Sequence, residues 1–124
     1  MWLKSTRAKG SQGEKIARRY LKKKGFKVLE MNFHARFAEI DIIALDKKTL
    51  VFVEVKSARN ERCGNPLDWI PLWKQNRIIR ASQLYINKKG LQGKPLRFDV
   101  VAINPDKEIS HIQDAFRPRG NVFV

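Results

Sequence analysis

The sequence is poor in acidic residues, with 12 Asp and Glu against 26 Lys and Arg and a formal net charge of +14. Its single cysteine, Cys63, excludes an intrachain disulfide and a cysteine zinc cluster, and such usage is typical of a reducing cytosol. No apolar run approaches the roughly 20 residues of a membrane span, and Met1 to Lys4 lacks the apolar core of a signal peptide. These absences predict a cytoplasmic protein without a membrane segment.

The chain also lacks internal repeats, low-complexity segments and a linker rich in Pro and Gly. Its 124 residues are enough for one domain, and 43% hydrophobic residues favour a globular fold over disorder. We expect a single domain over residues 1–124, with a core of about 11–116, a basic N-terminal segment 1–10 and a C-terminal arm 117–124.

The excess of positive charge is the strongest feature of the composition. It predicts a polyanionic partner, which we take to be nucleic acid, without indicating sequence specificity. Much of the charge lies at the start, since the first 29 residues contain ten Lys or Arg and one acid, Glu14. The candidates for nucleic-acid contacts are Arg18, Arg19, Arg36, Arg59, Lys74 and Arg77.

Hydrophobic periodicity predicts an α/β fold with the element order αβββαβ and a short extra strand. The expected helices run from Ser11 to about Gly25 and from Leu72 or Trp73 to about Gly90, with Ser11 as N-cap. The expected strands are residues 26–33, the two arms of a hairpin within 37–57, residues 96–103 and residues 109–112. Residues 58–71, which include Arg59, have the composition of a loop that can cover a substrate.

One face of the hairpin is apolar near the turn and charged toward the other end of the two strands. Whether its turn holds two residues or four, Leu45 faces Leu50, so cross-strand partners sum to 95. On that register Asp41 lies opposite Glu54, with their Cβ atoms about 5 Å apart. Because like charges in opposite positions repel, this pair needs a cation or a proton. Carboxylate oxygens on a rigid frame suit Mg²⁺ or Mn²⁺.

The same register places Glu39 opposite Lys56. A solvated hairpin face with Glu39 and Lys56 as a surface ion pair is therefore the alternative to a metal site. Four apolar residues on the same face argue against this alternative, because a solvated face would expose them to water: Ile43, Leu45, Leu50 and Phe52. The hairpin residues alone leave both interpretations open.

Two further charged residues have two interpretations each. Glu14 shares a helix flank with Ala17 and Leu21, which points it toward the protein interior, but a first-turn acid also complements the positive end of a helix. Lys74 begins a stripe that Ile78 continues. Its ammonium either enters the same cleft as Lys56 or stays in water while its stem covers apolar surface.

Two other polar residues are weaker candidates for chemistry. His34 lies in a connection, where contact with phosphate or water is the expected role and metal binding is not. Asp99 lies beside Arg97 on a predicted strand, a pattern that favours a structural ion pair over a catalyst.

Residue blocks along nearly the whole chain resemble the bacterial YraN family. Asp41 followed after twelve residues by Glu54-Val55-Lys56 is similar to the Asp…Glu-x-Lys core of the restriction-endonuclease-like superfamily. The blocks that resemble the YraN family are Gly13-Glu14, Ala17, Tyr20-Leu21, Glu39-Ile40-Asp41-Ile42-Ile43-Ala44, Phe52-Val53-Glu54-Val55-Lys56, Lys74, Arg97-Phe98-Asp99-Val100-Val101 and Ala115-Phe116. The resemblance implies a restriction-endonuclease-like αβββαβ core with a mixed central sheet flanked by helices.

The resemblance also implies roles for the residues of these blocks. The implied catalytic residues are Glu14, Asp41, Glu54 and Lys56. Asp41, Glu54 and the Val55 carbonyl would hold Mg²⁺ or Mn²⁺, and Glu14 would act through water or a second metal. Lys56 would orient or help deprotonate the attacking water and stabilise developing charge. We expect the orienting role, because a lysine is a poor base unless its pKa is lowered, and Glu39 in the opposite position would raise that pKa instead. The family usually has Gly where this chain has Ala38.

The family is regarded as predicted endonucleases related to archaeal Holliday junction resolvases. The resulting prediction is a Mg²⁺- or Mn²⁺-dependent endonuclease that hydrolyses DNA phosphodiester bonds at branched or distorted sites in recombination or repair, with DNA rather than RNA as the expected nucleic acid. A homodimer is consistent with cutting two symmetry-related strands. The alternative is a non-catalytic nucleic-acid-binding module that keeps the nuclease fold. A third interpretation is a protein-partner adaptor that uses Trp69, Trp73 and Phe123.

Overall fold

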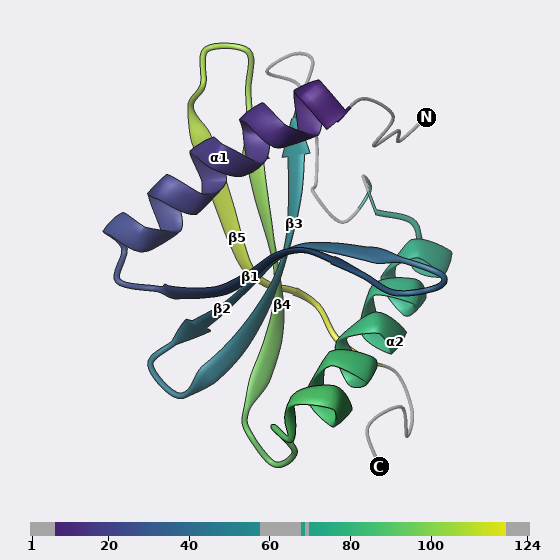
Figure 1. Ribbon diagram of the computed structural model, residues 1–124. Helices are drawn as coiled ribbons and strands as arrows, with labels where there is room; N and C mark the ends of the chain where they lie inside the picture. Colours follow the sequence, from purple (N-terminus) through teal and green to yellow (C-terminus); the bar gives the residue numbers. More distant parts are fainter. Residues whose placement is uncertain (1–6, 58–67, 69, 119–124) are drawn as a thin grey trace.

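The computed structural model describes residues 7–57, 68 and 70–118, with side chains from residue 12 onward. Arg59, Trp69 and Phe123, and most of the predicted loop and arm, lie outside these residues. The elements follow the chain as α1 (Arg7–Lys23), β1 (Lys27–His34), β2 (Glu39–Asp46), β3 (Thr49–Ser57), α2 (Leu72–Lys89), β4 (Leu96–Ile103) and β5 (Ile109–Phe116) (Figure 1). The predicted α/β class and αβββαβ order are confirmed, with β5 as an added strand.

The five strands form one mixed sheet in the order β1-β2-β3-β4-β5. Only β3 and β4 pair in parallel, and the crossover between them contains α2, as parallel neighbours require. The other neighbours are antiparallel and are joined by short connections. The mixed central sheet expected from the resemblance is therefore present.

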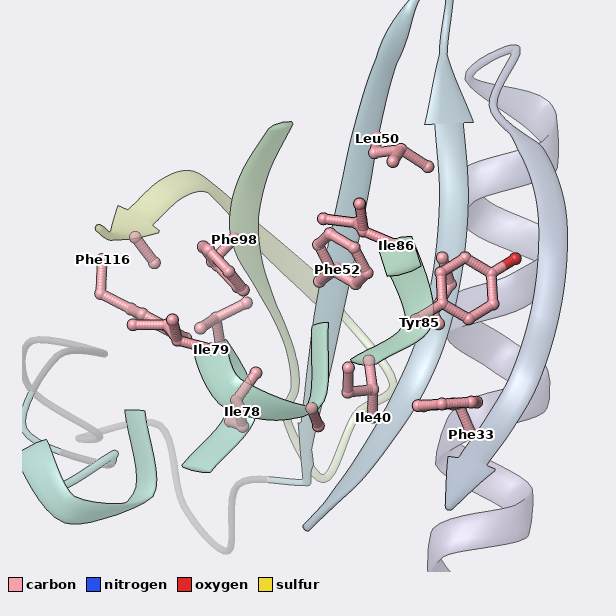
Figure 2. Packing of buried hydrophobic residues seen from close by; sticks show 14 of the residues in the cluster. Phe33, Ile40, Leu50, Phe52, Ile78, Ile79, Tyr85, Ile86, Phe98 and Phe116 are labelled. Carbon is pink, nitrogen blue, oxygen red and sulfur yellow. The ribbon is translucent and has the colours of Figure 1, made fainter. Parts of the chain in front are cut away.

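Each face of the sheet packs against one helix. Alternation along β3 directs Val51, Val53 and Val55 into the apolar layer beneath α1, and Leu50 and Phe52 into the layer beneath α2. Figure 2 shows the α2 layer, in which helix side chains point toward the aromatic rings of the strands. These two layers hold the central strand rigidly, with its C-terminal end at the candidate site.

Glycine ends both helices, and α1 starts earlier than predicted. Gly25 and Gly90 have positive φ angles of 95° and 65°, a conformation that glycine adopts without steric cost. Because α1 begins at Arg7, Ser11 lies within the helix and is not its cap. None of the described helices is long and apolar enough to cross a membrane.

The last strand is longer than its sequence indicates. It runs to Phe116 and passes through Asp114, whose φ of 55° is unusual for a strand residue. The Asp114 backbone N–H donates a hydrogen bond to Asp99 Oδ1 at 3.0 Å. A side chain of β4 thus supports β5 where the register shifts, and the polar residues there gave no strand signal.

Candidate functional site

The β2–β3 hairpin has the predicted register and opens at its far end. Lys47 and Lys48 form a two-residue turn, and the ladder continues from there to the pair Ile42 and Val53, so partners sum to 95. The next position on this register would pair Asp41 with Glu54. Both acids therefore lie directly beyond the last ladder pair.

The Asp41 side chain bridges the two strands at this opening. Its Oδ2 accepts a buried hydrogen bond from the Val55 backbone N–H at 2.8 Å. In a continued ladder the amide of Val55 would instead bond to the Ile40 carbonyl. The carboxylate of Asp41 thus takes over the function of a backbone carbonyl, which fixes it beside the chain segment that carries Glu54.

A break in the alternation of β2 accompanies this arrangement. Strict alternation predicts Ile40 on the same face as Ile42, but Ile40 packs with Ile43 in the α2 layer, so that expectation is wrong. The position opposite Asp41 on β1 is Asn32, whose φ is 54°. The irregular backbone of β1 at Asn32 changes the direction of the end of β2. The Asp41 side chain can therefore contact β3.

Asp41 and Glu54 are both removed from solvent, with 0% and 2% of their surfaces exposed. Glu54 shares its strand face with Leu50 and Phe52, and Lys56, two residues further on, is half-buried. Two neighbouring carboxylates in such surroundings are costly unless positive charge compensates them. This end of β3 is therefore suited to a cation.

The Val55 carbonyl is a third candidate oxygen ligand. In a strand the N–H and C=O of one residue point to the same side. Because the Val55 N–H points to Asp41, its carbonyl also faces the opening between β2 and β3. Mg²⁺ commonly takes one or two carboxylates and completes its octahedron with waters and substrate phosphates. The donors Asp41, Glu54 and Val55 fit that pattern.

Glu14 follows Gly13, at which α1 approaches the same end of β3. It is 7% exposed and lies about two turns into the helix, so it is not a first-turn acid that complements the helix end. The close approach is made by Gly13, where an added Cβ would lie 2.9 Å from Ser57 Oγ. Within the described residues, however, no three His, Cys, Asp or Glu side chains assemble into a group that could hold a metal. Glu14 therefore does not complete a three-acid cluster.

Two expectations for the connection before β2 can be compared with the structure. Ala38 is not among the described non-glycine residues with positive φ, so alanine fits where the family usually has glycine. Glu39 lies opposite His34 on β1, with 4.0 Å between His34 Nε2 and Glu39 Oε1. The expected opposition of Glu39 and Lys56 is not part of the β2–β3 ladder, which ends before those residues.

The predicted nucleic-acid contacts are spread over both faces. Arg18 and Arg19 are exposed on α1, and Arg36 is exposed between β1 and β2. Lys74 is half-buried on the stripe that contains Ile78. Arg77 is exposed on α2 with its guanidinium 5.1 Å from the centre of the Trp73 ring.

The sequence interpretation missed Arg80 and Phe37. The Arg80 guanidinium lies 4.3 Å from the centre of the Phe37 ring, so it joins α2 to the connection that leads into β2. A sequence signal for Arg80 exists, because Trp73, Arg77 and Arg80 recur at helical spacing (i, i+4, i+7). No local pattern pairs Arg80 with Phe37.

The predicted ion pair of Asp99 with Arg97 is part of a larger buried network. Arg97 Nε and His111 Nε2 lie 3.0 and 2.8 Å from the two carboxylate oxygens of the fully buried Asp99. His111 Nδ1 lies 3.1 Å from the Tyr20 hydroxyl, and Arg97 also pairs with Asp46 at 3.1 Å. Burial lowers the pKa of Arg97, but Asp99 and Asp46 outweigh it and raise that pKa above its ordinary value. The network ties α1, β2 and β5 to β4.

Comparison with known proteins identifies the family to which this chain belongs. The model of the uncharacterised protein family UPF0102 matches residues 13–103. A UPF0102 protein of Geotalea uraniireducens is 49% identical over 111 residues, which cover 86% of this chain and 87% of that protein. UPF0102 proteins of Nitrosococcus oceani and Persephonella marina are each 44% identical, covering 90% and 87% of this chain and 93% and 92% of their own lengths. The chain therefore belongs to the UPF0102 family, which is the YraN family expected from its residue blocks.

Proposed function

We propose that this protein is a Mg²⁺- or Mn²⁺-dependent endonuclease that hydrolyses phosphodiester bonds of DNA. One observation carries the proposal: buried Asp41 and Glu54 both lie directly beyond the last ladder pair of a hairpin, and Asp41 accepts a hydrogen bond from the Val55 backbone. The net charge of +14 supports a polyanionic substrate. Bacterial DNA lies in the cytoplasm, which is the proposed location and suits the lone Cys63.

The chain's own residues would divide the work as follows. Asp41, Glu54 and the Val55 carbonyl hold the ion, which when bound polarises the phosphodiester and lowers the pKa of a water. The Lys56 ammonium orients the attacking water and stabilises the charge that develops on the phosphate. Glu14 acts from α1 through water. The exposed arginines fix the DNA backbone, and a homodimer would present two such sites to two strands.

Cleavage assays on duplex, single-stranded, flap and four-way-junction DNA test the proposal. We expect cleavage with Mg²⁺ or Mn²⁺ and none with EDTA. Lys56→Gln keeps all of the proposed ligands, so it should bind Mn²⁺ normally yet cleave about 10²-fold more slowly, as when one charge-stabilising donor is lost. Cleavage that persists in EDTA, or a Lys56→Gln protein as active as the wild type, would contradict the proposed roles.

The non-catalytic binding module remains the competing proposal, and one observation favours it: no three His, Cys, Asp or Glu side chains of the described residues form a group that could hold a metal. It requires binding to DNA or RNA that weakens steeply with salt, without turnover of any substrate in the panel. Absence of both cleavage and metal uptake would select this function.

A further inference from the structure

The outer surface of α2 presents a stripe of side chains of which only Arg77 is among the predicted nucleic-acid contacts. Trp73, Arg77, Arg80 and Leu84 follow one another at helical spacing, opposite the buried stripe of Ile78 and its neighbours. Trp73 is 58% exposed and Leu84 is 45% exposed. All three exposed large hydrophobic residues of the described chain, Leu72, Trp73 and Leu84, lie on α2, and apolar side chains gathered on one surface mark interaction sites.

The charge of α2 restricts what that partner is. The helix has no acidic residue among its 18 positions and contains five cations: Lys74, Arg77, Arg80, Lys88 and Lys89. This positive charge favours an anionic partner over a neutral apolar protein surface.

The geometry of the stripe indicates flat ligand groups. The Arg77 guanidinium lies over the Trp73 ring and the Arg80 guanidinium lies over the Phe37 ring, with distances of 5.1 and 4.3 Å to the ring centres. Planar rings and guanidinium groups are the surfaces on which nucleobases stack. Trp73 and Arg80 lie about 10 Å apart along the helix axis, room for two or three bases spaced about 3.4 Å apart.

The stripe is connected to the candidate site through Phe37. This residue lies in the connection before β2, four residues from Asp41, so their Cα atoms are at most about 14 Å apart. A strand held on α2 would thus lie within a few nucleotides of the two carboxylates.

We propose that Trp73, Arg77, Arg80 and Phe37 form a stacking platform for an unpaired DNA segment beside the scissile bond. The bases of a duplex hide their flat faces in the helical stack, so the platform engages only a strand that is single or has been splayed open. This inference rests on the proposed function for its substrate and defines the substrate class as DNA with an unpaired segment. The same platform would favour flaps and junctions over intact duplex.

Binding measured in EDTA tests the platform without cleavage. The probes are a labelled oligothymidylate of about 12 nucleotides, within the range of known single-strand sites, and a blunt duplex of equal length. Trp73→Ala should weaken binding to the single strand about 10-fold and leave the duplex within about 2-fold. Trp73→Phe should keep the single-strand affinity, because an aromatic face remains. The quenching of tryptophan fluorescence by the bound oligonucleotide should be smaller than in the wild type, because Trp73 no longer contributes to it.

Lys88→Ala is the matched control, since it removes an exposed cation of the same helix away from the rings. It should weaken both probes equally, as loss of a phosphate contact does. If Trp73→Ala weakens both probes equally or neither, or if Trp73→Phe quenches like the wild type, the platform is wrong. If Trp73→Ala weakens single-strand binding but no DNA is cleaved, only the proposed function is wrong. If DNA is cleaved but Trp73→Ala does not change binding, only the platform is wrong.

Discussion

Asp41→Asn is expected to lower DNA cleavage by about 10³-fold or more, since it removes the charge of a ligand while preserving its shape. The amide oxygen of asparagine can still accept the Val55 N–H that the carboxylate accepts at 2.8 Å. The hairpin should therefore keep its geometry. Removal of one of two opposed acids should even leave the free energy of unfolding in EDTA unchanged or slightly raised. Gel-based cleavage with Mg²⁺ and urea unfolding measure the two effects.

Asp46→Asn is the matched control for this experiment. It makes the same chemical change at the other end of β2, where the carboxylate pairs with Arg97 and not with the proposed ion. Its cleavage rate should stay close to that of the wild type. Cleavage by Asp41→Asn within about 10-fold of the wild-type rate would be inconsistent with a ligand role for Asp41.

Asp99→Ala is expected to reduce the free energy of unfolding by about 3–5 kcal/mol, the usual cost of breaking a buried ion pair on one side. Asp99 is 0% exposed and accepts hydrogen bonds from Arg97 and from the Asp114 backbone, with His111 Nε2 at 2.8 Å. Its removal leaves a half-buried guanidinium with less compensating negative charge and removes the support of β5. Urea unfolding monitored by circular dichroism measures the change.

Asp99→Asn and Asp106→Ala make this result interpretable. An asparagine in place of Asp99 would keep an acceptor for the Asp114 amide, so Asp99→Asn should destabilise the fold less than Asp99→Ala. If Asp99→Ala does not fold, Asp99→Asn should still fold and can be measured. Asp106 is exposed in the β4–β5 turn, and its replacement should change the free energy of unfolding by no more than about 0.5 kcal/mol. A cost below about 1 kcal/mol for Asp99→Ala would show that the network does not hold the sheet together.

The parts of the fold that depend on local chemistry could be predicted from the sequence. Alternation and turn residues predicted the pairing of Leu45 with Leu50, and this register places Asp41 and Glu54 directly beyond the last ladder pair. Gly90 marked the end of α2 because only a residue that tolerates positive φ ends a helix in this way. These features require no knowledge of the rest of the chain.

Other parts depended on contacts between distant residues. Ile40 changed faces because the backbone opposite Asp41 is irregular at Asn32, a feature that no periodicity reports. His111 joins Tyr20 across 91 residues, and Arg97 joins Asp46 across 51. Side chains this far apart in sequence carry no joint pattern, so the network could be recognised only as the local pair Asp99 and Arg97.

Uptake of Mn²⁺ measured by titration calorimetry tests the central claim most directly, because it requires neither a substrate nor turnover. The wild type should bind Mn²⁺ with a stoichiometry of at least one ion per chain, and Glu54→Gln should weaken that binding about 10-fold or more while remaining folded. Equal binding by both proteins, or none by the wild type, would mean that the buried carboxylates at the end of β3 do not form a metal site.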